Sequence, residues 1–215
     1  QITASYAETR LAWEPIVEVT QIKGDSETHS KLSPNDDFAD FENYEYYIQV
    51  GKTEFMPREA DFIRPALKAG LEIEKSVGVN PYKFGLIGST DSHSGLSSPE
   101  ESNFLGKFAT DSTPETKQRL GGQLSANGWD MSASGLAAVW AEHNTREEIF
   151  AAFKRREVYA TSGPRIILQL YAGWFFPEGA EASNDFSNIG SEYGVPMGGE
   201  LVATSEAQNS ISILI

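Results

Sequence analysis

An aspartate and a histidine separated by one residue, Asp91 and His93, follow a short apolar run at residues 84–87. Carboxylate oxygens and imidazole nitrogens are common ligands of zinc, manganese and iron, and a spacing of two on an extended backbone points both side chains in the same direction. The pair is therefore a candidate metal site. The alternative is a turn in which Asp91 accepts hydrogen bonds from nearby backbone amides while His93 lies on the surface.

A second group of candidate ligands surrounds an earlier apolar stretch, residues 16–20, which we predict to be a strand. Glu18 interrupts this strand. Because an unpaired buried carboxylate is costly, Glu18 needs a partner or a metal unless it points to solvent. Glu27 and His29 lie in the polar loop that follows and repeat the spacing of two. They are either further ligands or ordinary surface residues.

The elements that must position these side chains follow an α/β pattern. Residues 84–87 include adjacent rather than alternating apolar residues, which is typical of a strand covered on both faces in a parallel sheet. An amphipathic helix is predicted over residues 58–75, and a helix directly before a strand is the alternation that builds parallel sheets and barrels. Ligands collect beyond the carboxyl ends of such strands, which is where Asp91 and His93 stand.

Two further segments flank the predicted site in the sequence. Residues 95–135 are rich in Gly, Ser, Asn and Thr and have little periodicity, which predicts a loop that covers the strand ends, with a short helix at residues 114–120. Thr145 and Glu148 have the spacing of a capping box and predict the start of a helix that runs to about residue 156.

Strands predominate in the last part of the chain. We predict strands at residues 158–161 and 165–171, and from there a periodicity of two with Gly, Asn and Pro punctuation predicts a β-rich appendage. The chain opens on Gln1 and closes on an alternating strand pattern at residues 210–215, from which we expect it to be a piece of a longer protein.

Composition narrows the function classes. Seventeen basic against 31 acidic residues give a net charge of −14, which disfavours binding to nucleic acid or to an anionic membrane. No apolar stretch approaches the roughly 18 residues of a membrane span. Cysteine is absent, so any metal must be held by His, Asp and Glu.

Five segments together resemble a bacterial family known as domain of unknown function 3604. They are residues 17–29, 84–96, 139–142, 159–165 and 194–199. That family in turn looks like the polymerase-and-histidinol-phosphatase (PHP) branch of metal-dependent hydrolases. The resemblance implies a distorted (β/α) barrel with divalent metal ions at the strand ends. It makes residues 1–165 the C-terminal part of such a barrel and residues 166–215 a β-rich appendage.

The resemblance also implies roles for individual residues. Asp91 and His93 would be the terminal ligand pair and the catalytic residues, with Glu18, Glu27 and His29 as ligands from an earlier strand end. The sequence departs from the PHP pattern because it lacks the opening His-x-His pair of that branch. It contains three histidines in all, and the missing pair would lie upstream of Gln1 or would have been lost.

The predicted function is a metal-dependent hydrolase, most simply a phosphoesterase, that uses zinc, manganese or iron and a small anionic substrate. Lys23 and Arg165 are the candidate substrate-binding cations, although each is also consistent with a surface or salt-bridge role. His143, just before a helix cap, is assigned a structural or surface role. Two alternatives remain open: a non-catalytic domain that binds carbohydrate or protein on a degenerate barrel, and a metal-dependent amidase or lactonase. The resemblance favours an exported bacterial protein, and the oligomeric state is open.

Overall fold

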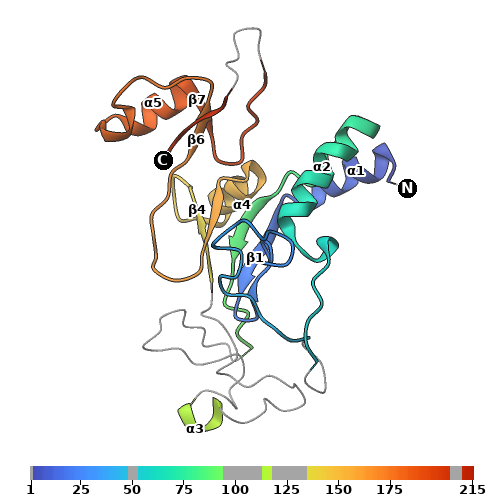
Figure 1. The fold of residues 1–215 in the computed structure, drawn as a ribbon. Coiled ribbons are helices and arrows are strands. Elements are labelled where there is room, and N and C mark those ends of the chain that lie inside the picture. The colour runs from blue at the N-terminus through green and yellow to red at the C-terminus, as the bar shows by residue number, and fades with distance from the viewer. Residues whose placement is uncertain (1, 48–52, 94–112, 118–134, 204–209) are drawn as a thin grey trace. The chain divides into compact units, whose positions relative to one another are not determined.

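The computed structural model describes residues 2–47, 53–93, 113–117, 135–203 and 210–215. The chain divides into two compact units (Figure 1). The first consists of residues 1–138 and 160–164, and the second of residues 139–159 and 165–215. All five predicted metal ligands belong to the first unit, and Arg165 belongs to the second.

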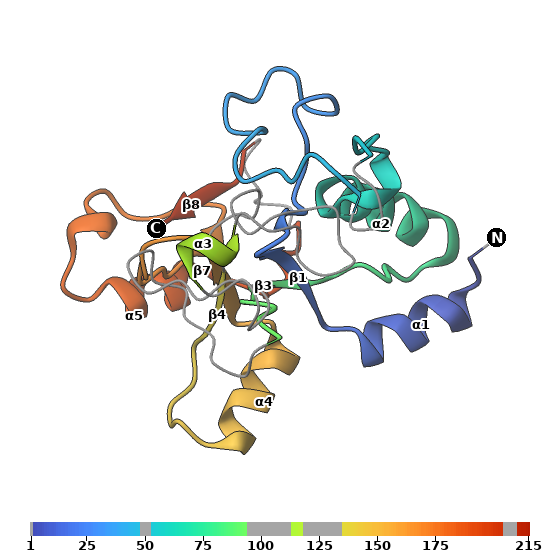
Figure 2. The ribbon, with the colours of Figure 1, turned by 90° about the horizontal axis from the view of Figure 1, so that it is seen from below.

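β1 (Ile16–Gln21) is the central strand of a three-stranded sheet in the first unit. Its apolar and β-branched residues suit an extended, partly covered backbone. β2 (Gly24–Asp25) returns antiparallel on one side, and β3 (Gly85–Gly88) runs parallel on the other. Figure 2 shows β1 and β3 next to each other from below. The strand at residues 16–20 and its parallel partner are therefore confirmed.

Helix α1 (Ala4–Trp13) begins and ends where its sequence requires. The hydroxyl of Thr3 accepts a hydrogen bond from the Tyr6 N–H at 3.3 Å, which satisfies one of the amides at the start of the helix. The helix ends ahead of Pro15, because the residue before a proline disfavours the helical conformation.

Helix α2 (Ile63–Val77) follows the short 3-10 helix η1 (Glu59–Asp61). It therefore starts later than the predicted residue 58. Pro65 falls in its first turn, where backbone amides lack intrahelical partners, so the proline is accommodated there. The helix ends at Gly78, whose φ of 82° is the left-handed conformation that glycine adopts readily. The four-residue helix α3 (Pro114–Lys117) confirms the start of the short helix predicted at 114–120, whose last residues lie outside the described part.

The boundary between the units passes through β4 (Leu136–Val139) and β5 (Val158–Thr161), which pair with each other. Between them, α4 (Arg146–Arg155) is capped by the Thr145 hydroxyl, which accepts from the Glu148 N–H at 3.3 Å. The predicted start of this helix is confirmed, and β5 matches the predicted strand.

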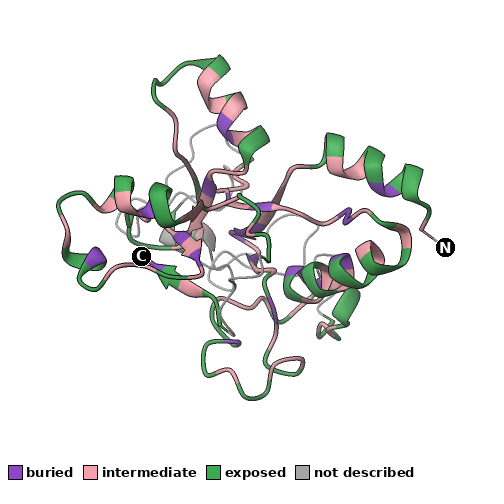
Figure 3. Cartoon of the chain, turned by 90° about the horizontal axis from the view of Figure 1, so that it is seen from above, coloured by how far each residue is buried: buried purple, intermediate pink, exposed green. Residues whose placement is uncertain are grey.

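The rest of the second unit is a small sheet with a helix beside it. β6 (Tyr171–Gly173) lies between β7 (Gly194–Pro196) and β8 (Ser212–Leu214), antiparallel to both. The 3-10 helix η5 (Ala180–Ala182) and helix α5 (Phe186–Tyr193) connect β6 to β7. Tyr171, Ala180 and Leu214 form the buried core, against which Phe176, Phe186 and Ile189 pack. Figure 3 shows that, among the residues that the structure describes, buried positions are a minority.

The predicted barrel is wrong. The described strands form sheets of three, two and three strands, and none of these sheets closes on itself. A barrel requires every strand to pair with two neighbours around a ring. β3 instead pairs with β1 alone among the strands that the structure describes. The chain is a mixed α/β protein with small separate sheets.

The strand predicted at residues 165–171 is also wrong for most of its length, because regular strand structure starts only at Tyr171. Side chains take up the backbone groups that a strand would have paired. The Tyr159 hydroxyl donates to the Ile166 carbonyl at 3.0 Å and accepts from the Leu168 N–H at 3.2 Å. The Trp140 indole donates to the Leu168 carbonyl at 2.8 Å. These bonds satisfy backbone groups of Ile166 and Leu168, while the Leu170 carbonyl accepts from the Met197 N–H, just after β7, at 2.9 Å.

Candidate functional site

The turn after β3 is fixed by its backbone. The Ser89 N–H donates to the Thr20 carbonyl at 3.0 Å, and the Gly135 N–H donates to the Ser89 carbonyl at 3.0 Å. Gly88 has no room for a side chain, because a Cβ there would lie 2.9 Å from the Leu136 carbonyl oxygen. This close approach of three segments positions the residues that follow Ser89.

Asp91 and His93 lie side by side after this turn. Asp91 Oδ1 and His93 Nε2 are 3.2 Å apart, within hydrogen-bond distance. The Asp91 side chain is 28% exposed and that of His93 is 51% exposed, so both are accessible to small solutes. Asp91 has a φ of 44°, an uncommon conformation for a non-glycine residue, which aspartate adopts more readily than most. The close pairing expected from the spacing is present, whereas metal binding by the pair stays a prediction.

The separation of these two atoms suits common ligation of one cation. With bonds of about 2.0–2.1 Å, two ligands in a tetrahedral shell lie roughly 3.3 Å apart. The donor types also suit zinc or manganese. However, the described residues contain no group of three or more His, Asp or Glu side chains that could hold a metal. The residues present therefore fit two positions of a coordination shell.

Glu18 reaches the same turn from β1. The Ser89 hydroxyl donates to Glu18 Oε1, and the Gln21 amide donates to Glu18 Oε2 at 3.2 Å. Glu18 lies opposite Ile87 in the parallel register, which explains how its side chain meets a residue just beyond β3. The half-buried carboxylate thus has the partners that its position in an apolar strand requires.

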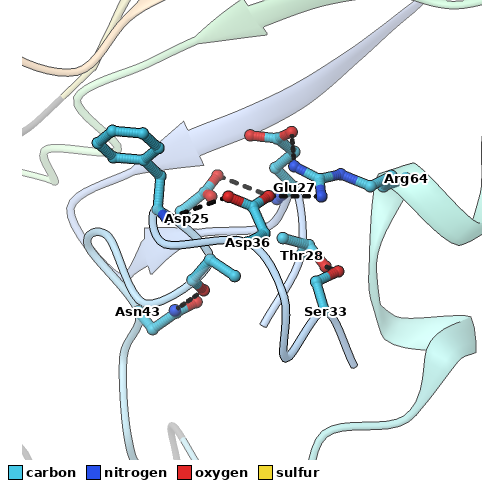
Figure 4. A network of polar contacts seen from close by, with 9 residues as sticks. Asp25, Glu27, Thr28, Ser33, Asp36, Asn43 and Arg64 are labelled. Atoms are coloured by element: carbon cyan, nitrogen blue, oxygen red, sulfur yellow. Dashed lines mark hydrogen bonds and ion pairs between the residues drawn. The ribbon is translucent and has the colours of Figure 1, made fainter. Parts of the chain in front are cut away.

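Glu27 points to α2 instead. Its Oε1 forms an ion pair with Arg64 Nη2 at 2.6 Å, and Arg64 Nη1 pairs with Asp36 Oδ2 at 2.7 Å. Figure 4 shows the guanidinium between the two carboxylates. The hydrogen bond from Arg64 lowers the pKa of Asp36. No contact joins Glu27 to Asp91 or His93 in the described part of the chain.

His29 and Lys23 border a cavity of about 220 Å³ in the first unit. Burial, reinforced by the charge of Lys31, lowers the pKa of His29, so its ring is neutral near pH 7. His29 Nδ1 accepts the Lys31 N–H at 3.1 Å, which leaves the proton on Nε2. Lys23 Nζ donates to the Ser26 hydroxyl at 2.8 Å. These two residues thus belong to a different place from the Asp91 and His93 pair.

Asp25 is a further titratable residue at this place, and its sequence context did not mark it as functional. It borders both the 220 Å³ cavity and a neighbouring one of about 180 Å³. Burial, followed by the charge of Glu27, raises the pKa of Asp25 from 3.8 to about 6, although its Oδ1 accepts the Glu27 N–H at 3.0 Å. A carboxyl group with such a pKa can hold or release a proton near neutral pH. Gly24, which begins β2 with a φ of 108°, was the available signal for the tight turn between β1 and β2.

Arg165 is exposed in the irregular segment before β6, and His143 is exposed before α4. Substrate binding by Arg165 stays a prediction. The predicted cover at residues 95–135 lies largely outside the described residues. Within the described part, no helix is long and apolar enough to cross a membrane.

Comparison with known proteins places the chain in a family. Neither a curated protein nor a solved structure matches it. One family model, described as "Protein of unknown function (DUF3604)", matches residues 1–215. The chain therefore belongs to the DUF3604 family.

Proposed function

We propose that this chain acts as a metal-dependent hydrolase in which Asp91 and His93 provide two ligands of a divalent cation. The observation that carries the proposal is the 3.2 Å separation of Asp91 Oδ1 and His93 Nε2 at an accessible turn with unusual backbone geometry. The resemblance to the PHP branch supports the proposal at the level of this residue pair. The barrel of that branch forms no part of it.

The roles of the residues follow from their chemistry. Asp91 contributes negative charge and His93 a neutral nitrogen donor, which is the form in which imidazole binds metals. Glu18 is a positioning residue, since its carboxylate holds Ser89, two residues before Asp91. A divalent cation bound there would supply Lewis acidity and lower the pKa of a bound water.

Phosphoesters are the proposed substrates. A cation neutralises the charge of a phosphoryl oxygen, which a chain with a net charge of −14 would otherwise repel. Two protein ligands leave several coordination positions open, so substrate oxygens, water or further donors would complete the shell.

Turnover assays test this proposal. The 215-residue chain is assayed with p-nitrophenyl phosphate, bis-p-nitrophenyl phosphate, a lactone and an amide, each with and without Mn²⁺ or Zn²⁺. We expect metal-dependent phosphoester hydrolysis that Asp91→Asn or His93→Gln reduces on the order of 100-fold or more, because each change removes a ligand. His143→Gln is the matched control and leaves the rate unchanged. Metal-dependent turnover of only the lactone or the amide would change the substrate class. Absence of metal-dependent turnover on all four would overturn the proposal.

A further inference from the structure

The 220 Å³ cavity of the first unit has a wall of aromatic side chains. We call Tyr44, Tyr46, Tyr47, Phe55 and Phe62, all of which border the cavity, the aromatic wall. The volume corresponds to about seven water molecules at roughly 30 Å³ each, which suits one small ligand group and excludes a folded partner.

The rings of the aromatic wall are inclined steeply to one another. The Tyr47 and Phe55 centroids are 5.1 Å apart at 78°, and those of Phe55 and Phe62 are 6.1 Å apart at 56°. The Tyr44 and Tyr46 centroids are 6.0 Å apart at 79°. Such edge-to-face and tilted contacts are arrangements that aromatic pairs prefer, so the rings pack against one another as well as bordering the cavity.

Backbone hydrogen bonds hold the wall together. The Tyr47 N–H donates to the Thr53 carbonyl at 3.0 Å, and the Phe55 N–H donates to the Glu45 carbonyl at 2.8 Å. The Ile63 N–H, next to Phe62, donates to the Ser26 carbonyl at 3.0 Å. The first two bonds pair residues 45–47 with residues 53–55, and the third ties the start of α2 to the loop after β2. The cavity is thus formed in the folded chain before any ligand arrives.

The charged groups at the cavity include two carboxyl groups, those of Asp25 and Asp61. Asp61 pairs with Arg58 at 2.8 Å, and the hydrogen bond from Arg58 lowers the pKa of Asp61, so this group is an anion at neutral pH. Lys23 is the one cation at the cavity among the described residues, and its ammonium group donates to Ser26. The neutral ring of His29 adds no positive charge.

We propose that this cavity binds a small organic cation, of the quaternary or tertiary ammonium class. Aromatic faces attract cations through their quadrupole, and cages of aromatic rings are a recurrent solution for ammonium ligands. The carboxyl group of Asp25 adds attraction, whereas the charge of Asp61 is largely offset by the paired Arg58. The net charge of −14 raises the local concentration of cations. An anion would be repelled by the ring faces and the carboxyl groups. An uncharged ligand would gain neither the cation–π attraction nor the attraction to carboxylates.

The test compares two probes of the same shape. Choline and its uncharged carbon isostere 3,3-dimethyl-1-butanol are titrated into the chain by calorimetry and by NMR. We expect choline to bind at least about ten-fold more tightly, since only the positive charge differs. Equal binding of both compounds would overturn the proposal, as would tighter binding of a neutral sugar such as glucose, or no binding of choline at its highest soluble concentration.

Two variants and one control assign the site. Phe55→Leu removes a ring of the aromatic wall and is expected to weaken choline binding at least about five-fold, whereas Phe38→Leu alters a side chain that is 82% exposed and outside the cavity, and leaves it unchanged. Asp61→Asn keeps the shape of the side chain and is expected to weaken binding of choline but not of the isostere. Circular dichroism checks that each variant is folded. Choline binding that both Phe55→Leu and Asp61→Asn leave unchanged would place the ligand elsewhere and refute the assignment.

This inference is independent of the proposed hydrolase. Asp91→Asn, His93→Gln and addition of a chelator should leave choline binding intact, because neither residue borders the cavity. Loss of choline binding on chelation would contradict a site made of rings and carboxyl groups alone.

Discussion

Asp25 is held in an environment that opposes its charge. Its half-buried carboxyl group faces the charges of Glu27 and Lys23, and it shares the larger cavity with His29 and Asp61. Burial is the largest cause of the raised pKa, so the ionised form is stabilised less in the folded chain than in the unfolded one.

The raised pKa predicts how stability changes with pH. Between about 4 and 6 the folded chain holds a proton on Asp25 that the unfolded chain has released, so the free energy of unfolding falls as pH rises through this window. A shift from 3.8 to about 6 corresponds to about 3 kcal/mol before solvent screening, and to an order of 1–2 kcal/mol for a half-buried group. Asp25→Asn should therefore stabilise the chain by that amount at pH 7 and by nothing at about pH 3.5, below both pKa values.

Urea unfolding at several pH values measures this difference. The free energy of unfolding is plotted against pH for the parent chain and for Asp25→Asn, and one curve is subtracted from the other. The lowered pKa values of Asp36 and Asp61 change stability in the opposite direction, but they are common to both proteins and cancel in the difference. An Asp25→Asn variant that is less stable than the parent chain at pH 7, or whose advantage is the same at every pH, would contradict the assigned pKa.

Ser89 carries a second prediction at this scale. Its hydroxyl donates to the half-buried carboxylate of Glu18, and hydrogen bonds to charged groups are worth more than neutral ones. Ser89→Ala should lower the free energy of unfolding by about 1–2 kcal/mol. Ser30→Ala, at an exposed loop position, is the control and should change it by less than about 0.5 kcal/mol. Equal effects of the two substitutions would show that the Glu18 contact contributes nothing.

Elements that depend on local signals were predicted well. The strand β1 and the cap of α4 each follow from residues within a few positions. The segment at residues 165–171 was predicted wrongly, because Tyr159 and Trp140 supply its hydrogen bonds from elsewhere in the sequence. A periodic pattern records which residues prefer an extended backbone and does not record which partner they meet.

The cap of α4 gives a prediction at the scale of the element. Thr145→Ala removes the acceptor for the Glu148 N–H and should cost about 1 kcal/mol of stability, whereas Thr145→Ser keeps the hydroxyl and should cost much less. Thermal unfolding of the parent chain and the two variants, followed by circular dichroism, measures both losses of stability. If the serine variant loses as much as the alanine variant, the hydroxyl does not cap the helix.

At the scale of the whole molecule, the barrel predicted from the sequence is wrong, and the cavity with the aromatic wall was not predicted. One parallel pair, β1 with β3, meets the local expectations of both a barrel and an open sheet, and closure depends on long-range pairings that no local pattern specifies. The cavity likewise combines Asp25 of β2 with side chains from residues 43–47 and 55–62, and no single motif marks it. The pairing of Asp91 with His93 could be predicted, because both residues lie in one short turn.

The central claim is that Asp91 and His93 bind one divalent cation, and the chain's three histidines make it directly measurable. In NMR spectra of the histidine rings, substoichiometric Mn²⁺ should broaden the signals of His93 before those of His29 and His143, and Asp91→Asn should abolish this preference. Simultaneous broadening of all three histidines, or preferential broadening of His93 that survives Asp91→Asn, would contradict the account.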